Sequence, residues 1–251
     1  MTLSFKNTAI TFSCFLSLFL FTTTSLGQFV DGPLERAPKN ALVKKAILPG
    51  SLALIGLLLT ESDFEKDFQV DVRNRLGNDF ATSLDDYTRY VPIAQLYIAD
   101  IAGIQAKNHW FDQTKNLVIS AGLTQLITGG MKKAIYKERP NQFNADAFPS
   151  GHTSNAFANA TVLYEEFKDS NSFLAYSGYG FAMTTGALRV MNNKHWISDV
   201  FMGAAVGIMV TKLVYHFDYL FPWNPFKRKN DFVLLPSYSE GAVGIHLQKR
   251  F

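Results

Sequence analysis

Cysteine is nearly absent from this sequence of 251 residues. The one cysteine, Cys14, lies in the first apolar segment, which lacks the Leu three positions earlier that a lipoprotein signal would carry. A single thiol excludes an internal disulfide and any metal site built from several thiolates. A chain without disulfides is nevertheless tolerated in an oxidising compartment, so the low cysteine content does not exclude export.

Charge is also scarce, since Asp, Glu, Lys and Arg make up 18% of the chain and the formal net charge is +3. Lys and Arg form no clustered stripe, which excludes a nucleic acid as partner. Hydrophobic residues make up 47% of the chain, including 22 Phe and 10 Tyr, so a disordered or low-complexity protein is excluded. The mean hydropathy of +0.03 is too low for a chain that lies mostly in lipid.

The first 27 residues have the pattern of a secretory signal peptide. Lys6 precedes a long charge-free run, and small residues lie three and one positions before the expected cleavage site. The apolar centre, residues 12–21, is shorter than the ~20 residues of a membrane span, which disfavours the alternative of an uncleaved anchor. We therefore predict a signal peptide over residues 1–27, a polar connector over residues 28–45, and export to the periplasm or cell envelope.

Apolar stretches of helical length recur along the rest of the chain, with no internal repeat. Their spacing of Gly, Ala and Leu favours helices over strands. The six stretches are residues 46–60, 90–104, 116–131, 155–164, 172–188 and 200–214. The sequence therefore predicts an all-α protein whose helical domain, residues 46–220, is a bundle with a six-helix core.

A charged segment, residues 61–89, separates the first two apolar stretches. We expect it to be partly helical and solvated, with a break at residues 77–79, where Gly, Asn and Asp follow one another. Its role stays open between a lid, a partner surface and plain solvent-facing structure.

The composition of the six stretches leaves their relation to a membrane open. A span needs about 17–25 apolar residues, but ionisable residues such as Asp100, Glu165 and Lys212 interrupt or end several stretches. We expect the helices to be buried in a bundle outside the bilayer. Integral membrane helices are the alternative, because ionisable residues inside a span can also mark a functional site.

The C-terminal tail, residues 221–251, combines two patterns. Aromatic residues and prolines over 221–226 precede three cations at 227–229, an order typical of a membrane surface and also of a Pro-stiffened linker. Two β-type segments, residues 232–238 and 242–251, then flank a polar turn. We predict a small β-hairpin packed against the bundle, and keep a membrane-surface contact as an expectation for the tail.

Residues that carry chemistry gather between positions 132 and 199. Lys132 and Arg139 are seven residues apart, close to two helical turns, so on a continuing helix both cations project from one face. Pro140 then disfavours further helix through Arg139. The spacing predicts a paired cationic edge at a helix end, although such a pair is often only a solvated face.

A second motif, Pro149-Ser150-Gly151-His152, immediately precedes an apolar stretch. Ser150 has the side chain of an N-cap, and Gly151 allows a ligand to approach the backbone closely. The free N–H groups at a helix start form an anion site, at whose mouth His152 would lie. The alternative is a capped helix start with an incidental histidine.

A third motif consists of Arg189, His195 and Asp199. With His195 and Asp199 at positions i and i+4 of one helix, the carboxylate can accept a hydrogen bond from the protonated ring nitrogen. This bond fixes the tautomer, so that the other ring nitrogen presents its lone pair. This is the arrangement of a base with an orienting acid. A purely structural hydrogen bond, with Arg189 neutralising Asp199, is the alternative.

Taken together, the three motifs resemble the signature of the type 2 phosphatidic acid phosphatase family, which includes bacterial acid phosphatases and vanadium haloperoxidases. That signature reads Lys-x6-Arg-Pro, Pro-Ser-Gly-His and Ser-Arg-x5-His-x3-Asp, and the chain departs from it at Leu188, where the family usually has Ser. The replacement removes a hydrogen-bonding group and leaves the charged groups intact. The resemblance implies an all-α bundle of the acid phosphatase/vanadium haloperoxidase type.

The resemblance also implies a role for each motif residue. His195 would be the nucleophile that carries the phosphoryl group, Asp199 would orient His195, and His152 would be the general acid and base. No metal or other cofactor is implied. The residues expected to bind phosphate are Lys132, Arg139, Ser150, Gly151 and Arg189. We therefore expect a hydrolase of phosphomonoesters, with lipid phosphates or diphosphates among the candidate substrates.

Two other functions remain compatible with the same motifs. A vanadium haloperoxidase would hold vanadate in the same cationic site, although such enzymes are generally much longer. A non-catalytic phosphate-binding protein of the envelope would follow if Leu188 spoils the site. The sequence determines neither the alcohol part of a substrate nor the oligomeric state.

Overall fold

The computed structural model of the protein describes residues 39–226, 232–239 and 242–249, with side chains for residues 43–226. The predicted signal peptide lies outside the described residues. The helices are α2 (Lys39–Leu59), α3 (Asp63–Leu76), α4 (Leu84–Thr88), α5 (Val91–Ile101), α6 (Trp110–Ile135), α7 (Gly151–Phe167), α8 (Ser172–Met191), α9 (Ile197–His216) and the short η2 (Asp218–Leu220). Every regular element described up to residue 226 is therefore helical.

The six apolar stretches correspond to α2, α5, α6, α7, α8 and α9, although residues 90–104 extend beyond both ends of α5 and residues 46–60 extend one residue past α2. The first helix begins earlier than expected, at Lys39, inside the region assigned to a polar connector. The run from Lys39 to Leu48 contains neither Gly nor Pro, so nothing in it ends a helix. Pro49 lies inside α2, so the helix continues through a residue that commonly ends one.

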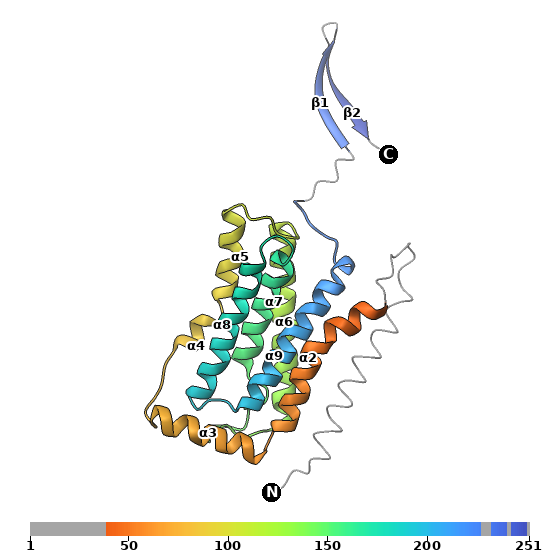
Figure 1. Ribbon diagram of the computed structural model, residues 1–251. Coiled ribbons are helices and arrows are strands. Elements are labelled where there is room, and N and C mark those ends of the chain that lie inside the picture. Colours follow the sequence, from red (N-terminus) through yellow and green to blue (C-terminus); the bar gives the residue numbers. More distant parts are fainter. Residues whose placement is uncertain (1–38, 227–231, 240–241, 250–251) are drawn as a thin grey trace. The chain divides into compact units, whose positions relative to one another are not determined.

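The helices pack around α7, which runs through the middle of the bundle (Figure 1). α5, α6, α8 and α9 all contact α7, and α2 lies along α9. α3 crosses one end of the bundle and contacts α8 and α9. The first turn of α7 and the loop before α9 contain fully or nearly fully buried polar side chains, namely Thr153, Ser154 and His195.

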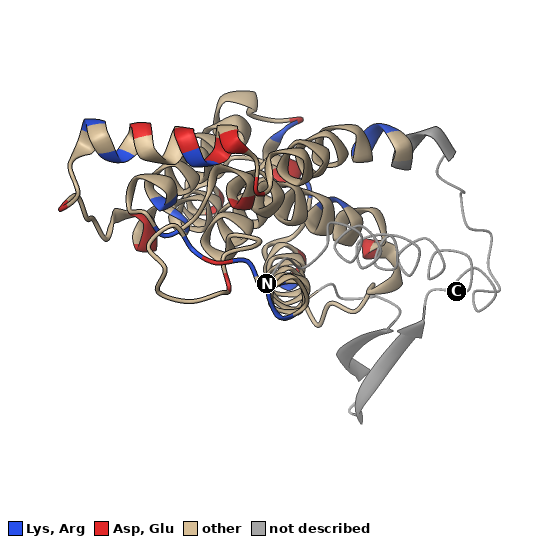
Figure 2. Ribbon diagram, turned by 90° about the horizontal axis from the view of Figure 1, so that it is seen from below, with Lys and Arg blue, Asp and Glu red and all other residues tan. Residues whose placement is uncertain are grey.

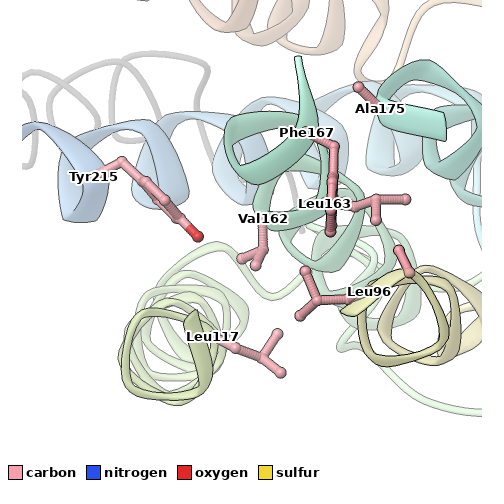
Figure 3. Close-up of a cluster of buried hydrophobic side chains, with 8 residues drawn as sticks. Leu96, Leu117, Val162, Leu163, Phe167, Ala175 and Tyr215 are labelled. Carbon is pink, nitrogen blue, oxygen red and sulfur yellow. The ribbon is translucent and has the colours of Figure 1, made fainter. Parts of the chain in front are cut away.

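A cluster of buried apolar side chains holds four helices together (Figure 3). Leu96 of α5, Leu117 of α6, Leu163 of α7 and Tyr215 of α9 are each at most 7% exposed. Full burial of side chains of this size stabilises a fold by about 1.5–3 kcal/mol each. This packing determines the relative positions of the helices that carry the three sequence motifs.

Two glycines of α9 allow a close approach to the beginning of α7. A Cβ on Gly203 would lie 2.8 Å from the backbone oxygen of Ser150, and a Cβ on Gly207 would collide with the backbone oxygen of Ser154. Any larger residue would therefore push the two helices apart. At this crossing the backbone N–H of Ser150 donates to the backbone oxygen of Asp199 at 3.0 Å, which links the second and third motifs directly.

The charged segment, residues 61–89, forms α3 and α4, and its predicted break is confirmed. Gly77 ends α3 with a φ of 85°, a backbone conformation that favours glycine, and its N–H donates to the oxygen of Arg73. Figure 2 shows acidic and basic residues following one another along α3. The segment thus has the partly helical structure that its composition predicts.

The prediction that this segment is solvated is wrong for one face of it. Glu65, Gln69 and Asp85 are buried. The amide of Gln69 donates to the backbone oxygen of Val190 at 3.1 Å and to the side-chain oxygen of Asn193 at 2.7 Å. Polar side chains tolerate burial when they find such partners, and here the partners lie more than a hundred residues away in the chain.

Residues 218–251 form a second compact unit. After η2, the strands β1 (Phe232–Ser239) and β2 (Ala242–Lys249) pair antiparallel, with Leu234 opposite Leu247. The residues between the strands and the three cations at 227–229 lie outside the described residues. The predicted packing of the tail against the bundle stays a prediction.

Among the described residues, α9 is long and apolar enough to cross a membrane, and the bent pair of α2 and α3 would be a second candidate if its two helices count as one broken span. The bend within that pair is 88°. In α9, 67% of the apolar window is buried inside the bundle, as in the core helix of many proteins. Length and composition therefore leave a membrane span open.

Candidate active site

The three sequence motifs meet at a cavity of about 500 Å³. Both predicted histidines and three predicted cations line it, namely His152, His195, Lys132, Arg139 and Arg189. Gly151 also lines it, whereas Ser150 does not. The side chains come from the end of α6, the loop after it, the start of α7, the end of α8 and the loop before α9.

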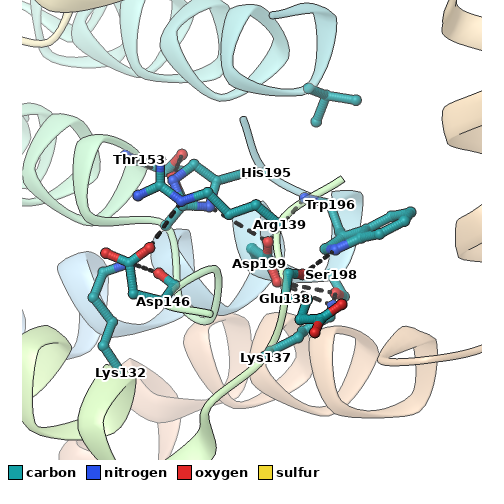
Figure 4. Close-up of polar contacts among 12 residues, drawn as sticks. Lys132, Lys137, Glu138, Arg139, Asp146, Thr153, His195, Trp196, Ser198 and Asp199 are labelled. Carbon is teal, nitrogen blue, oxygen red and sulfur yellow. Dashed lines mark hydrogen bonds and ion pairs between the residues drawn. The ribbon is translucent and has the colours of Figure 1, made fainter. Parts of the chain in front are cut away.

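Lys132 and Arg139 reach the cavity by a different route from the one predicted (Figure 4). The helix does not continue to Arg139: α6 ends at Ile135, and Tyr136 takes a left-handed conformation with a φ of 54°. Arg139 therefore lies in a loop, where its Nε donates to Asp146 Oδ1 at 2.9 Å. Lys132 donates to the backbone oxygen of Asp146, so one residue holds both cations.

Burial changes the acidity of Lys132. It lowers the pKa of Lys132 to about 8, the charge of Asp146 opposes this shift, and the positive charge of Arg139 adds to it. An ammonium group with this pKa is largely protonated at neutral pH. A bound anion would replace the interactions with water that the group loses on burial.

The predicted cap at the start of α7 is confirmed. The Oγ of Ser150 accepts hydrogen bonds from the backbone N–H of Thr153 at 3.4 Å and from its hydroxyl at 2.9 Å. Ser150 is fully buried and its hydroxyl is engaged in this cap, so it lies behind the cavity wall. Gly151 and His152 form the first turn of α7, and both face the cavity.

His152 has an acidic partner that the sequence motifs do not include. Its Nε2 lies 2.7 Å from Oδ1 of Asp86, which also lines the cavity. Burial lowers the pKa of His152, the positive charge of Arg189 lowers it further, and the hydrogen bond with Asp86 opposes the shift. Asp86 thus orients the ring of His152.

Arg189 is held by Asp85, the acid that precedes Asp86 in α4. Its Nη1 donates to Asp85 Oδ2 at 2.6 Å, and the amide of Asn192 donates to Asp85 Oδ1 at 3.0 Å. Arg189 is 4% exposed, and its Nε has no hydrogen-bond partner among the described residues. A buried donor of this kind needs an acceptor, and an anion in the cavity would supply one.

His195 and Asp199 do not lie on one helix as predicted. α9 begins at Ile197, so His195 belongs to the preceding loop, and its Nδ1 lies 3.4 Å from Asp199 Oδ2 (Figure 4). The same carboxylate oxygen accepts the backbone N–H of Trp196 at 2.8 Å, which caps the helix. His195 is 1% exposed, and burial lowers its pKa to about 4 against the opposing effect of Asp199. The imidazole is therefore neutral at pH 7.

The cavity as a whole favours an anion. Its lining residues include five cations and one carboxylate, since Arg89 and Lys194 join the three predicted cations and Asp86 is the acid. Asp85, Asp86 and His152 are close enough to share a metal ion. Both oxygens of Asp85 already accept hydrogen bonds from Arg189 and Asn192, so we assign Asp85 to holding Arg189.

The three sequence motifs do not include Asp85, Asp86, Arg89 and Lys194. The first three belong to the segment interpreted as solvated, 43 or more residues before the first motif cation, and no periodicity connects them to it. Adjacent acids at the start of a short helix are common, so they carried no signal. Only the packing of α4 against α7 and α8 places Asp86 and Arg89 at the cavity and Asp85 against Arg189.

Comparison with known proteins gives a consistent result for this region. The family model of the PAP2 superfamily matches residues 113–223, which contain all three motifs. The lipid A 1-phosphatase of Porphyromonas gingivalis is 33% identical over 176 residues, which cover 68% of this chain and 38% of that protein. The chain thus spans well under half the length of this relative.

Two solved structures are similar as well. The crystal structure of LpxE from Aquifex aeolicus is 21% identical, with a TM-score of 0.44 over 59% of this chain and 94% of that one. A transmembrane PAP2-type phosphatidylglycerolphosphate phosphatase from Bacillus subtilis is 20% identical, with a TM-score of 0.49 over 72% of this chain and 99% of that one. The match of the family model to the residues that converge on the cavity, together with the relative at 33% identity, identifies the chain as a member of the PAP2 superfamily.

Proposed function

We propose that the protein is a metal-independent phosphatase that hydrolyses lipid phosphates through a phosphohistidine intermediate. One observation carries the proposal: a buried neutral imidazole, His195, shares a cavity with several fixed cations and with Arg189, whose Nε is an unpartnered donor among the described residues. A neutral imidazole beside a bound phosphate dianion is a competent nucleophile.

In the first half-reaction, Nε2 of His195 attacks phosphorus while the bond to the leaving alkoxide breaks. We assign the ring proton of His195 to Nδ1, where Asp199 Oδ2 accepts it at 3.4 Å and stabilises the positive charge that develops on the ring. The cations Lys132, Arg139 and Arg189 stabilise the phosphoryl oxygens. Protonated His152 donates its proton to the alkoxide, which leaves as an alcohol.

In the second half-reaction, water attacks the phosphohistidine. His152, now neutral, accepts a proton from the water, the bond between phosphorus and His195 breaks, and inorganic phosphate is released. The cycle returns each group to its starting protonation state. The fixed cations stabilise charge where other phosphatases use metal ions, so the mechanism needs no metal.

Two observations support a lipid as the substrate. The relative at 33% identity is named for its action on lipid A, although the chain spans only part of it. In addition, α2 carries large apolar side chains that are more than half exposed, including Ile47, Leu54 and Leu58. An exposed apolar surface of this kind suits a protein that works at lipid.

We expect the purified full chain to release phosphate from lipid phosphomonoesters in detergent micelles, and to do so equally with and without EDTA. The assay compares phosphatidate, phosphatidylglycerophosphate, lipid A and polyprenyl diphosphate with water-soluble phosphomonoesters. Sustained inhibition by EDTA would contradict the metal-independent mechanism. Peroxide- and vanadate-dependent halogenation in place of phosphate release would establish the haloperoxidase alternative, and binding without turnover would establish a phosphate-binding protein.

We further propose that residues 1–27 direct export and that the six helices α2 and α5 to α9 form the catalytic core in the cell envelope. The same phosphate-release assay locates the protein when it is applied to cell fractions. Activity is expected in the osmotic-shock or membrane fraction. Activity confined to the cytosol would contradict export, and a strict detergent requirement for extraction would favour integral membrane helices.

The lowered pKa of Lys132 gives a pH-dependent prediction. As the pH rises through about 8, Lys132 loses its charge, and the inhibition constant of inorganic phosphate should rise by about tenfold as one charge-assisted contact is lost. Phosphate is largely a dianion above about pH 8, and its remaining titration below that pH is the same for both proteins, so comparison with a variant cancels it. The variant Lys132→Arg keeps its charge and should lose this pH dependence. An identical profile in both proteins would exclude Lys132 as the titrating group.

A further inference from the structure

A second buried cation lies behind the candidate active site (Figure 4). Lys137, in the loop after α6, is 7% exposed and does not line the cavity. Its Nζ donates to both carboxylate oxygens of Glu65 at 2.9 and 3.0 Å, to Ser198 Oγ at 2.7 Å and to Asp199 Oδ1 at 3.0 Å. The ammonium group thus bridges an acid of α3 and the acid that faces His195.

Lys137 is the cation that offsets the two carboxylates of this buried group. Glu65 and Asp199 are 2% and 0% exposed. Two buried carboxylates without a cation would repel each other, and one of them would take up a proton. Lys137 lies between them and allows both to stay ionised.

The two oxygens of Asp199 have separate partners. Oδ1 accepts from Lys137, whereas Oδ2 accepts the backbone N–H of Trp196 and faces His195 Nδ1. A carboxylate held on both sides has one orientation, so Lys137 and the backbone N–H of Trp196 together determine where Oδ2 lies. The other charged groups near the ring are Arg189 and Lys132, which face His195 from the cavity side.

We propose that Lys137, anchored by Glu65, is a positioning residue that keeps Asp199 ionised and aimed at His195. The proposal rests on the proposed function, in which Asp199 stabilises the ring during phosphoryl transfer. Lys137 acts through Asp199 and touches no substrate. Its loss should therefore affect turnover more than substrate binding.

The experiment compares three full-length variants in the phosphate-release assay: Lys137→Met, Lys137→Arg and Glu65→Gln. Lys137→Met should lower kcat by about tenfold or more with KM changed less than about threefold, since loss of the orienting acid of a catalytic triad costs about 10⁴-fold and Lys137 acts one step further from the reaction. Lys137→Arg should recover a substantial part of kcat because it keeps the charge.

The pH dependence of kcat separates positioning from structural support. Without Lys137, the His195–Asp199 pair binds a proton more tightly, so the acid limb should move to higher pH. Glu65→Gln removes a negative charge from the same group, so its acid limb should move to lower pH or stay in place. Opposite or unequal shifts of this kind are not produced by partial unfolding, which lowers the amount of active enzyme at every pH.

Two outcomes would overturn the proposal: an unchanged acid limb in folded Lys137→Met, or an acid limb displaced in the same direction in both Lys137→Met and Glu65→Gln. Thermal melting monitors folding, and if Lys137→Met does not fold, the Glu65→Gln and Lys137→Arg profiles decide. The nucleophile variant keeps this test separate from the proposed function. If His195→Ala retains activity, the proposed function fails, whereas inactive His195→Ala with normal Lys137→Met overturns only the role of Lys137.

Discussion

Substitution of His195 by Ala should abolish turnover, with kcat reduced by about 10⁴-fold or more. The imidazole is the group that would form the covalent bond to phosphorus, and water cannot replace it in a cavity built for a side-chain nucleophile. Inorganic phosphate should still bind, because Lys132, Arg139 and Arg189 remain in place. Turnover is measured as phosphate release from a lipid phosphomonoester. Binding of inorganic phosphate is measured by calorimetry, or by competition with the substrate in an assay of the residual activity.

The chain offers a matched control for this prediction. His216 lies at the end of α9 and does not line the cavity, so His216→Ala should keep nearly full activity. Reactions quenched in alkaline denaturant, in which the phosphorus–nitrogen bond of a phosphohistidine is stable, should yield a protein-bound phosphoryl group in the native chain and none in His195→Ala. Undiminished turnover by His195→Ala would remove His195 from the mechanism.

Substitution of Arg189 by Met should damage both activity and stability. The variant loses the guanidinium whose Nε, unpartnered among the described residues, would bind a phosphoryl oxygen, so kcat/KM should fall by about 10²–10³-fold. It also leaves Asp85, which is fully buried, without its cation. Removing one partner of a buried ion pair costs about 3–5 kcal/mol in unfolding free energy. Denaturant unfolding and steady-state kinetics measure the two effects separately.

The double variant Arg189→Met with Asp85→Asn separates the two roles of Arg189. Neutralising Asp85 removes the unpaired buried charge, so the double variant should recover most of the lost stability. It should recover none of the lost activity, because the phosphate-binding cation is still missing. Recovery of activity together with stability would mean that Arg189 acts only as a structural partner of Asp85.

Much of the candidate site could be predicted from the sequence because its parts are local. Ser150 caps α7 as expected, since an N-cap needs only a hydroxyl a few residues from the N–H groups that it accepts. The apolar stretches lie in helices for the same reason, because helical periodicity is carried by neighbouring residues. The order and spacing of the motif residues then brought His152 and His195 into one hypothesis, and both line the cavity.

Some local expectations failed where backbone conformation intervened. The seven-residue spacing of Lys132 and Arg139 suggested one helix face, but Tyr136 ends α6 in a left-handed conformation that non-glycine residues rarely adopt. The four-residue spacing of His195 and Asp199 suggested one helix, but the capping of α9 by the carboxylate of Asp199 places His195 outside it. Spacing therefore indicated which residues belong together and gave the wrong backbone path between them.

The sequence by itself determined the helical class of the described part and the identity of the two histidines and three motif cations that face the cavity, because short-range periodicity and motif spacing encode both. Only the tertiary structure decided which acids serve those groups: Asp85 for Arg189, Asp86 for His152, and Glu65 through Lys137 for Asp199. Charge pairing between distant segments depends on burial and on a few ångströms of distance. The burial of these acids and their short distances to the cations arise only when α3 and α4 pack against the bundle.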